Sequence, residues 1–277
     1  MEKEILEKYK NKIINGTEIA DFIKFELQQK IKKEKINKNL AAILIGDNKN
    51  SVTYLNLKKK FANFINVGFC EYVINENEEE NNVIDAINFL NNDEEISGII
   101  LQLPIPKQFN EEKIINLIDR KKDIDGFLEN TKFNPVLGKV IFKILQEYDD
   151  DINKKREITI ICNSDIFSNK IESYLKTKLD ANINKVLFDQ KNIEEIKNIS
   201  KKSDIIISTV GKKHFITKDF VKDGSIIIDI GITKEDNKVY GDTNILDVID
   251  KVKYITPPIG GVGPMTVAML FDNLVNG

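Results

Sequence analysis

The chain has 277 residues, of which 41% are hydrophobic and 31% are charged, so it is long enough for one large domain or two modest ones around a buried core. Its 41 Lys and Arg residues nearly balance its 44 Asp and Glu residues, and the formal net charge of −3 gives no indication of a nucleic-acid-binding protein. The single histidine, His214, and the two cysteines, Cys70 and Cys162, exclude a two-histidine metal site and a structural cysteine-rich zinc site. Any Ser-His-Asp triad would have to use His214.

Two further features predict the compartment. The two cysteines are distant from each other in a long chain and do not form the dense disulfide framework of a small secreted domain. No run is long and apolar enough to span a membrane, and the first residues are polar and acidic, unlike a signal or transit peptide. We therefore expect a soluble cytoplasmic protein with neither a membrane nor a nucleic acid as its partner.

Short apolar runs rich in isoleucine alternate with stretches of helical spacing. The apolar runs predict strands, many of them buried on both faces, at residues 40–45, 70–74, 98–101, 158–162, 185–188, 204–208 and 225–230. The intervening stretches predict helices such as 51–67, 82–90, 111–118 and 192–199. Alternation of this kind indicates the α/β class with parallel sheets.

The clearest break in this pattern follows Asp125-Gly126, where residues 127–137 mix Asn, Thr, Pro and Lys without a clear period. A final helix is expected from Pro264, and the pattern alone does not assign it to either side of the break. We therefore predict two lobes, residues 1 to about 130 and about 131 to 262.

The first candidate constellation is a helix start containing Ser51, Tyr54 and Lys58, which follows a predicted strand. Ser51 suits the N-cap position, and Tyr54 and Lys58 share one helix face because they are four residues apart. A tyrosine ring offers a stacking surface, and a lysine with a lowered pKa offers an amine for proton transfer. The alternative is an ordinary amphipathic helix whose lysines, including Lys59 and Lys60, are exposed.

The second constellation is a buried strand that runs into Gln102 and two prolines, Pro104 and Pro106. Proline cannot continue a central ladder, so the strand must end here and leave Gln102 at its terminus. The amide offers both a donor and an acceptor. Taken alone, this side chain is better explained as a polar plug at a strand end.

The third constellation is Asp123 and Asp125, separated by one residue and followed by Gly126. Two carboxylates in this arrangement suit a metal site, a capped turn or a hydrogen bond to a heterocycle, and turn chemistry is the simplest of these.

The fourth constellation is the glycine-rich string at residues 256–266, in which Gly260, Gly261 and Gly263 precede Pro264. Glycines permit close approach of the backbone to a ligand, and amides at a helix start favour anions. The string is far more specific than a single glycine-rich turn.

Together the four constellations resemble the bifunctional methylenetetrahydrofolate dehydrogenase/cyclohydrolase family. That family carries a Ser-x-x-Tyr-x-x-x-Lys helix, a Gln-Leu-Pro-Leu-Pro strand end, a Lys-Asp-Val-Asp-Gly turn and a Pro-Gly-Gly-Val-Gly-Pro-Met-Thr segment, and this chain has their counterparts in the same order. The resemblance implies an N-terminal α/β catalytic lobe, a Rossmann-like parallel-sheet cofactor lobe and a C-terminal helix that returns to the catalytic lobe. The implied domains are 1–130 with 264–277 for the folate and 131–263 for NAD(P).

The resemblance also implies roles for individual residues on the folate side. Lys58 would be the central catalytic group, with Gln102 tuning it, Tyr54 packing against the folate ring and Asp125 bonding to the pterin. No metal is implied. The implied substrate-binding residues are Ser51, Tyr54, Gln102, Leu103, Pro104, Asp125, Gly260, Gly261 and Pro264.

On the cofactor side the resemblance is weaker. The family's Gly-Arg-Ser-x-Ile-Val-Gly-x-Pro corresponds here to Cys-Asn-Ser-Asp-Ile-Phe-Ser-Asn-Lys at residues 162–170, which lacks both glycines and the arginine. Glycines there permit close approach to a pyrophosphate, and Asp165 adds an unfavourable negative charge. The family's Pro-Cys-Thr-Pro-x-Gly is also altered, at residues 133–138. The cofactor would be NADP or NAD, bound by Ser164, Thr209, Gly211, Gly231 and Ile232.

Three functions follow from these patterns. The first is a bifunctional enzyme that oxidises 5,10-methylenetetrahydrofolate with NAD(P) and hydrolyses the methenyl product to 10-formyltetrahydrofolate. The second is a cyclohydrolase whose dehydrogenase activity is lost or much weakened. The third is a folate-binding or regulatory protein without turnover, against which the intact Lys58 constellation argues. The resemblance further implies a homodimer formed through the cofactor lobe.

Overall fold

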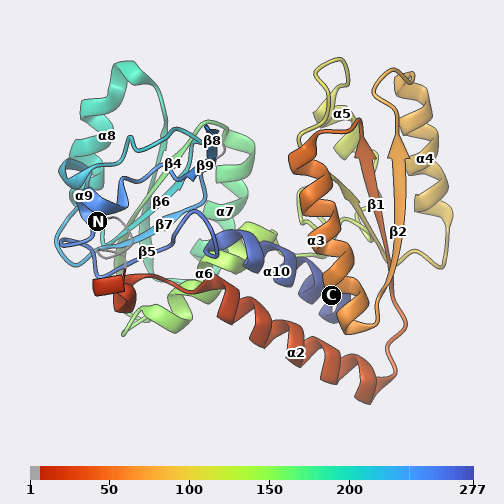
Figure 1. The fold of residues 1–277 in the computed structure, drawn as a ribbon, viewed down its shortest axis with the longest axis horizontal. Coiled ribbons are helices and arrows are strands. Elements are labelled where there is room, and N and C mark those ends of the chain that lie inside the picture. The colour runs from red at the N-terminus through yellow and green to blue at the C-terminus, as the bar shows by residue number, and fades with distance from the viewer. Residues whose placement is uncertain (1–6, 237) are drawn as a thin grey trace. The chain divides into compact units, whose positions relative to one another are not determined.

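The computed structural model describes residues 7–236 and 238–277. The chain divides into two compact units. One consists of the described residues of Met1–Ile19 together with Leu137–Thr266, and the other of Ala20–Val136 together with Val267–Gly277. Two helices, α2 (Gly16–Glu34) and α10 (Val262–Asn276), contribute residues to both units. Each unit has its own parallel sheet (Figure 1).

The unit containing Ala20–Val136 is built on a three-stranded parallel sheet in the order β2-β1-β3. In its register, Ala41 of the central strand lies opposite Cys70 on one side and Ile99 on the other. The strands are β1 (Asn39–Ile45), β2 (Gly68–Ile74) and β3 (Gly98–Leu101), and the helices between and after them are α3 (Lys49–Ile65), α4 (Glu80–Asn92) and α5 (Glu111–Ile115).

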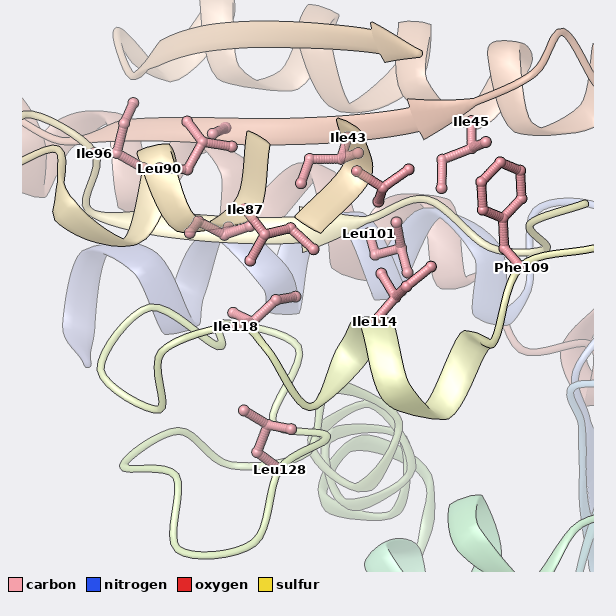
Figure 2. Close-up of a cluster of buried hydrophobic side chains, with 13 residues drawn as sticks. Ile43, Ile45, Ile87, Leu90, Ile96, Leu101, Phe109, Ile114, Ile118 and Leu128 are labelled. Carbon is pink, nitrogen blue, oxygen red and sulfur yellow. The ribbon is translucent and has the colours of Figure 1, made fainter. Parts of the chain in front are cut away.

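The core of this unit lies between the sheet and helices α4 and α5. Figure 2 shows Ile43 and Leu101 of the sheet gathered with Ile87 of α4 and Ile114 of α5, all of them buried. Because burial of an aliphatic side chain stabilises the fold by about 1.5 to 3 kcal/mol, this cluster fixes the sheet whose strand ends carry the candidate residues.

The other unit is built on a five-stranded parallel sheet in the order β10-β7-β6-β4-β5. The chain passes from β4 outward to β5 and then returns to β6 on the other side of β4, and such a reversal is where open α/β sheets bind ligands. The sheet strands are β4 (Arg156–Cys162), β5 (Ala181–Leu187), β6 (Ile205–Thr209), β7 (Ile226–Asp229) and β10 (Tyr254–Ile255).

Helices and a small hairpin complete this unit. The antiparallel strands β8 and β9 form the hairpin, which follows β7 in the sequence and does not pair with the five-stranded sheet. The elements are α6 (Val136–Tyr148), α7 (Asp165–Lys178), α8 (Ile193–Ser200), α9 (Ile245–Val248), β8 (Thr233–Glu235), β9 (Lys238–Tyr240) and the 3-10 turns Lys10–Lys12, Gln190–Asn192 and Lys218–Phe220.

The seven predicted strands and four predicted helices are confirmed, with shifted ends. Strand β5 starts four residues before the predicted position, because Asn182 and Asn184 interrupt its apolar pattern. Burial on both faces is wrong for β2 and β5, which are edge strands with several exposed side chains. The last helix begins at Val262 rather than Pro264; proline is tolerated in the first turn because the amide it lacks would have no partner there. No helix in the described residues is long and apolar enough to cross a membrane.

Candidate active site

Helix α3 presents the first candidate residues at its N-terminal half. Asn48, not Ser51, caps the helix: its side chain accepts hydrogen bonds from the amides of Asn50 at 2.9 Å and Ser51 at 3.3 Å. The predicted cap at Ser51 is therefore wrong. Ser51 lies inside the first turn, is buried, and its hydroxyl donates to the carbonyl of Leu103 at 3.5 Å, which joins the helix to the end of β3.

Lys58 lies about two turns beyond Ser51 and is held by Gln102. The Lys58 Nζ donates to Gln102 Oε1 at 2.8 Å, while Gln102 Nε2 donates to the carbonyl of Leu103 at 2.9 Å. Gln102 directly follows β3, and its backbone amide donates to the carbonyl of Ile43 at 2.8 Å, so the ladder fixes its position. The predicted strand-end position of Gln102 is confirmed, and the lysine–glutamine pair is brought together from residues 44 positions apart.

The turn at residues 122–126 separates the two carboxylates of the third constellation. Asp123 is buried and accepts hydrogen bonds from the amides of Phe127 at 3.3 Å and Leu128 at 2.8 Å, so it closes the turn. Gly126 has a φ of +71°, and a Cβ there would lie 2.6 Å from the carbonyl oxygen of Asn134, so glycine is required. The closure of the turn is thus carried by Asp123, and the carboxylate of Asp125 can interact with other groups.

Asp125 and Lys58 influence each other's protonation. Burial lowers the pKa of Lys58, and the negative charge of Asp125 partly opposes this shift. Burial raises the pKa of Asp125 to about 6; the charge of Lys58 opposes the rise and that of Asp123 adds to it. Both groups are therefore brought toward the pH range in which proton transfer is efficient.

Asn273 on α10 is a site residue that the sequence analysis missed. Its buried side-chain amide donates to the carbonyls of Ile124 and Asn134, both at 2.8 Å, and thereby ties the turn of Asp125 to the C-terminal helix. The same helix is anchored to α3 by the stacked rings of Phe61 and Phe271, whose centroids are 5.0 Å apart. No local signal marks Asn273, because its partners lie about 140 to 150 residues away in the sequence.

The other predicted substrate-binding residues fall into two groups. Tyr54 is exposed on α3, and Leu103 and the exposed Pro104 follow Gln102, joined by a cis peptide bond. Gly260, Gly261 and Pro264 belong to the other unit. There, Gly260 accepts a hydrogen bond from the amide of Thr17 at 3.0 Å, and a Cβ on Gly16 would lie 1.9 Å from the carbonyl oxygen of Gly261, so the glycines let the two helix starts meet.

The predicted cofactor-binding residues gather at the carboxyl ends of β4, β6 and β7. Asn163 Nδ2 donates to the carbonyl of Val210 at 2.9 Å, which links the loop after β4 to the loop after β6. Thr233 Oγ1 donates to the carbonyl of Gly211 at 3.0 Å, which links the latter loop to the one after β7. The five residues on these three loops are Ser164, Thr209, Gly211, Gly231 and Ile232.

The altered loop after β4 forms a helix start without glycine. Ser164 is the N-cap residue of α7 and has an extended backbone, with φ −144° and ψ 131°. Asp165 forms an ion pair with Lys185 at 2.6 Å, so the charge that was expected to oppose a phosphate has a cationic partner. Among residues 7–236 and 238–277, no three His, Cys, Asp or Glu side chains gather so as to hold a metal ion.

Comparison with known proteins agrees with this geometry. The catalytic-domain model of tetrahydrofolate dehydrogenase/cyclohydrolase matches residues 14–125, and the NAD(P)-binding-domain model of the same family matches residues 135–277. The chain belongs to this family. The bifunctional protein FolD of Thermodesulfovibrio yellowstonii is 36% identical over 276 residues, which cover 95% of each chain.

Solved structures show the same architecture. The bifunctional FolD enzyme of Campylobacter jejuni superposes with a TM-score of 0.86 at 32% identity, covering 95% of this chain and 96% of that one. The Trypanosoma brucei methylenetetrahydrofolate dehydrogenase-cyclohydrolase, solved with NADP and an inhibitor, has a TM-score of 0.86 at 25% identity over 95% of each chain.

These matches confirm the family that the four motifs resemble and the α/β class with a Rossmann-like lobe. They also confirm the prediction of a methylenetetrahydrofolate dehydrogenase and methenyltetrahydrofolate cyclohydrolase that uses NAD(P). The roles of single residues and the domain bounds stay predictions.

Proposed function

We propose that this chain catalyses both family reactions, the oxidation of 5,10-methylenetetrahydrofolate with NAD(P) and the hydrolysis of the methenyl product to 10-formyltetrahydrofolate. The observation that carries the proposal is the 2.8 Å contact between Lys58 Nζ and Gln102 Oε1, with the Asp125 carboxylate as the opposing charge. An exposed lysine on an amphipathic helix would have neither the glutamine partner nor a pKa lowered by burial.

Lys58 is proposed as the proton-transfer group of the hydrolysis. Water adds to the cationic methenyl carbon, and the neutral amine of Lys58 takes the proton that the water loses. The bond from this carbon to N5 then breaks, the hydroxyl proton leaves as the formyl C=O forms, and N5 receives one proton. One proton per turnover passes to solvent, so the step balances. Gln102 accepts a hydrogen bond from Lys58 Nζ and so holds the nitrogen in one place while its protonation changes.

Asp125, Tyr54 and Ser51 are proposed to bind the folate. The half-buried carboxylate of Asp125 is suited to accept hydrogen bonds from the amino-pyrimidine edge of a pterin, and the exposed ring of Tyr54 is suited to stack on it. Ser51, through its bond to Leu103, holds α3 against the end of β3. Leu103 and Pro104 are proposed to line the same substrate site, and Gly260, Gly261 and Pro264 are proposed as further substrate-binding positions.

The cofactor edge fits a dinucleotide. Gly211 is exposed with a φ of +74° and only one non-neighbouring atom within 4 Å of an added Cβ, so its backbone is open to a close partner. Ile232 is 42% exposed beside it and offers an apolar surface to a flat ring. Thr209, Gly211, Gly231, Ile232 and Ser164 would hold the nicotinamide dinucleotide, which when bound accepts the hydride of the methylene carbon.

The finer properties of the protein are also proposals. We assign residues 1–130 with 264–277 to folate binding and residues 131–263 to NAD(P) binding. We further propose a cytoplasmic homodimer whose partner molecules are small folates, with neither nucleic acid nor membrane among them; the net charge of −3 supports the exclusion of nucleic acid. Light scattering coupled to size exclusion tests the dimer, which a monomer mass at micromolar concentration would contradict.

A pair of spectrophotometric assays tests the bifunctional proposal. One follows reduction of NAD or NADP with methylenetetrahydrofolate, and the other follows hydrolysis of methenyltetrahydrofolate without cofactor. We expect both reactions. Hydrolysis without reduction of either cofactor would leave the predicted cyclohydrolase with lost dehydrogenase activity, and failure of both would leave the folate-binding protein without turnover.

A further inference from the structure

A cluster of buried polar side chains lies at the carboxyl ends of β6, β7 and β10, within the unit that carries the proposed cofactor residues. All five side chains are no more than 4% exposed, although none of them is among the predicted site residues. Four of them have the side-chain hydrogen bonds that costly burial of a polar group calls for, whereas the Thr243 hydroxyl has no partner among the described residues. They are Ser208, Asp229, Asp242, Thr243 and Thr256.

Asp242 is bonded to the loop after β6. Its Oδ2 accepts hydrogen bonds from the hydroxyl of Ser208 at 2.6 Å and the amide of Val210 at 2.9 Å. Its Oδ1 accepts from the amide of Lys212 at 2.6 Å. Val210 and Lys212 directly flank Gly211, so one carboxylate from 30 residues further along the chain fixes the backbone on both sides of that glycine.

Asp229 does the same for the loop after β7. Its Oδ1 accepts from the amide of Gly231 at 3.1 Å, and its Oδ2 accepts from the amide of Thr243 at 2.7 Å. The backbone amide of Asp229 in turn donates to Thr256 Oγ1 at 2.7 Å. The residue that follows Asp242 is thus bonded to Asp229, which couples the two carboxylates.

Two glycines make room for these carboxylates. A Cβ on Gly231 would lie 2.1 Å from Asp242 Oδ2, and a Cβ on Gly241 would lie 2.5 Å from Asp229 Oδ2. Each glycine therefore faces the carboxylate of the other segment, and the two segments interlock at a distance that no side chain allows.

We propose that Asp242, supported by Asp229, is a positioning residue of the dehydrogenase step: it sets the conformation of the loops after β6 and β7 and thereby the affinity for the nicotinamide dinucleotide. The inference rests on the proposed function, since Thr209, Gly211, Gly231 and Ile232 are proposed to bind the cofactor. Asp242 itself is fully buried and acts through these loops.

A carboxylate is needed at position 242 because both of its oxygens face donors. An asparagine would retain one oxygen and turn an NH2 group toward either the Lys212 amide or the Ser208 and Val210 donors, leaving at least one donor without a partner. Burial and the neighbouring Asp242 raise the pKa of Asp229 to about 7, in keeping with two carboxylates held close together. In the asparagine variant we expect the loops after β6 and β7 to change conformation and the strand ladder to stay as it is.

The test compares Asp242→Asn with Asp204→Asn. Asp204 is a matched control because it also accepts a backbone hydrogen bond, from the amide of Glu157 at 3.0 Å, but lies at the opposite end of β6. Calorimetric titration with NAD and with NADP gives the dissociation constant directly, and the two assays give the Michaelis constants for cofactor and folate.

For Asp242→Asn we expect cofactor affinity to fall by about tenfold to a hundredfold, as for a displaced binding loop, with the Michaelis constant for folate and the cyclohydrolase rate unchanged. Asp204→Asn should bind cofactor as the unaltered chain does. Unchanged cofactor affinity in Asp242→Asn, or a parallel loss of cyclohydrolase and dehydrogenase, would overturn the inference.

If Asp242→Asn does not fold, Ser208→Ala decides the matter, since it removes one hydrogen bond to Asp242 and should weaken cofactor binding by about threefold to tenfold. Wild-type affinity in that variant would overturn the inference. An unaltered chain that binds neither NAD nor NADP would overturn the inference and the dehydrogenase proposal together. If the unaltered chain has both activities and the variant binds the cofactor with the same affinity, the inference is overturned while the dehydrogenase proposal stands.

Discussion

Each unit of the molecule contains a pair of carboxyl groups whose pKa values are raised by burial, and the two pairs are used differently. In one unit Asp123 accepts backbone amides and closes a turn, while Asp125 is left to face Lys58. In the other unit Asp242 accepts three donors and Asp229 accepts two. The charge of Lys58 acts on the first pair, whereas the hydrogen bonds described for the second pair come from backbone amides and a hydroxyl.

A raised carboxyl pKa does not by itself identify a group that transfers protons. The pKa of Asp125 rises to about 6 and that of Asp229 to about 7, so both are perturbed by burial. A perturbed pKa marks a reacting group where the charge of a proton-transfer partner acts on it, as that of Lys58 does on Asp125. Where each carboxylate oxygen accepts a backbone amide, as in Asp229, the same shift marks a positioning group.

The largest test of this comparison is Lys58→Met. Methionine fills a similar volume but cannot transfer a proton, so we expect the cyclohydrolase rate to fall by about 10² to 10⁴, the usual contribution of general acid–base catalysis. The measurement is the initial rate of methenyltetrahydrofolate hydrolysis, corrected for the uncatalysed reaction. Lys60→Met is the matched control, because Lys60 is exposed on the same helix. Equal rates in the two folded variants would remove Lys58 from its proposed role.

Gly231→Ala tests the second pair by steric means. The added Cβ would lie 2.1 Å from Asp242 Oδ2 and must push the loop after β7 away from it. We expect a loss of dehydrogenase activity of about a hundredfold, as for a reacting group displaced by about 1 Å. Cyclohydrolase activity in the same sample serves as the internal control, and its loss in step with the dehydrogenase would show that the two units depend on each other in folding.

Asp125→Asn addresses the pH dependence of the first pair. With a pKa of about 6, Asp125 loses its charge as the pH falls through 6, so the unaltered enzyme should show an acidic limb there in kcat/KM. In the variant we expect the limb near pH 6 to disappear, because the carboxyl group that titrates there is replaced by an amide. At pH 8 the rate should fall by about tenfold or more. A limb that stays near pH 6 would assign the titration to another group.

Stability gives a second readout on the same variant. The folded pKa of Asp125 lies above its ordinary value of 3.8, so between about pH 4 and 6 the native state binds more protons than the unfolded state. The free energy of unfolding therefore falls as the pH rises through that window. Asp125→Asn should flatten this part of the stability profile measured by urea unfolding.

Much of this arrangement was predictable from the sequence. The isoleucine-rich runs locate the strands because a buried parallel strand needs apolar side chains on both faces. Tyr54, Lys58 and Gln102 were found because their spacing and strand-end position are local properties. The cap was misassigned because Asn48 and Ser51 are both good N-cap residues, and only the structure shows which side chain turns back to the helix amides.

The long-range bonds were not predictable in the same way. Asp242 and Ser208 lie 34 residues apart and are joined through side-chain oxygens, which leave no periodic pattern in the sequence. Asn273 bonds to carbonyls 149 and 139 residues away. Such partners follow from the packing of whole elements and leave no local signal at Asp242 or Asn273.

Asn273→Ala is expected to have the smallest effect, and it tests whether the turn of Asp125 must be held by the Asn273 side chain. The substitution removes the amide donor shared by the buried carbonyl of Ile124 and the partly buried carbonyl of Asn134, at a cost of about 1 to 3 kcal/mol in the free energy of unfolding. Asn276→Ala is the matched control, since Asn276 is exposed on the same helix and its side chain bonds those of Lys30 and Asp272 rather than the turn. Thermal unfolding measures the stability, and the pH profile of hydrolysis reports on Asp125. If the turn needs this tether, Asn273→Ala should broaden or shift the acidic limb near pH 6, whereas Asn276→Ala should leave it in place. A destabilised variant with an unchanged profile would show that Asp123 alone fixes the position of Asp125.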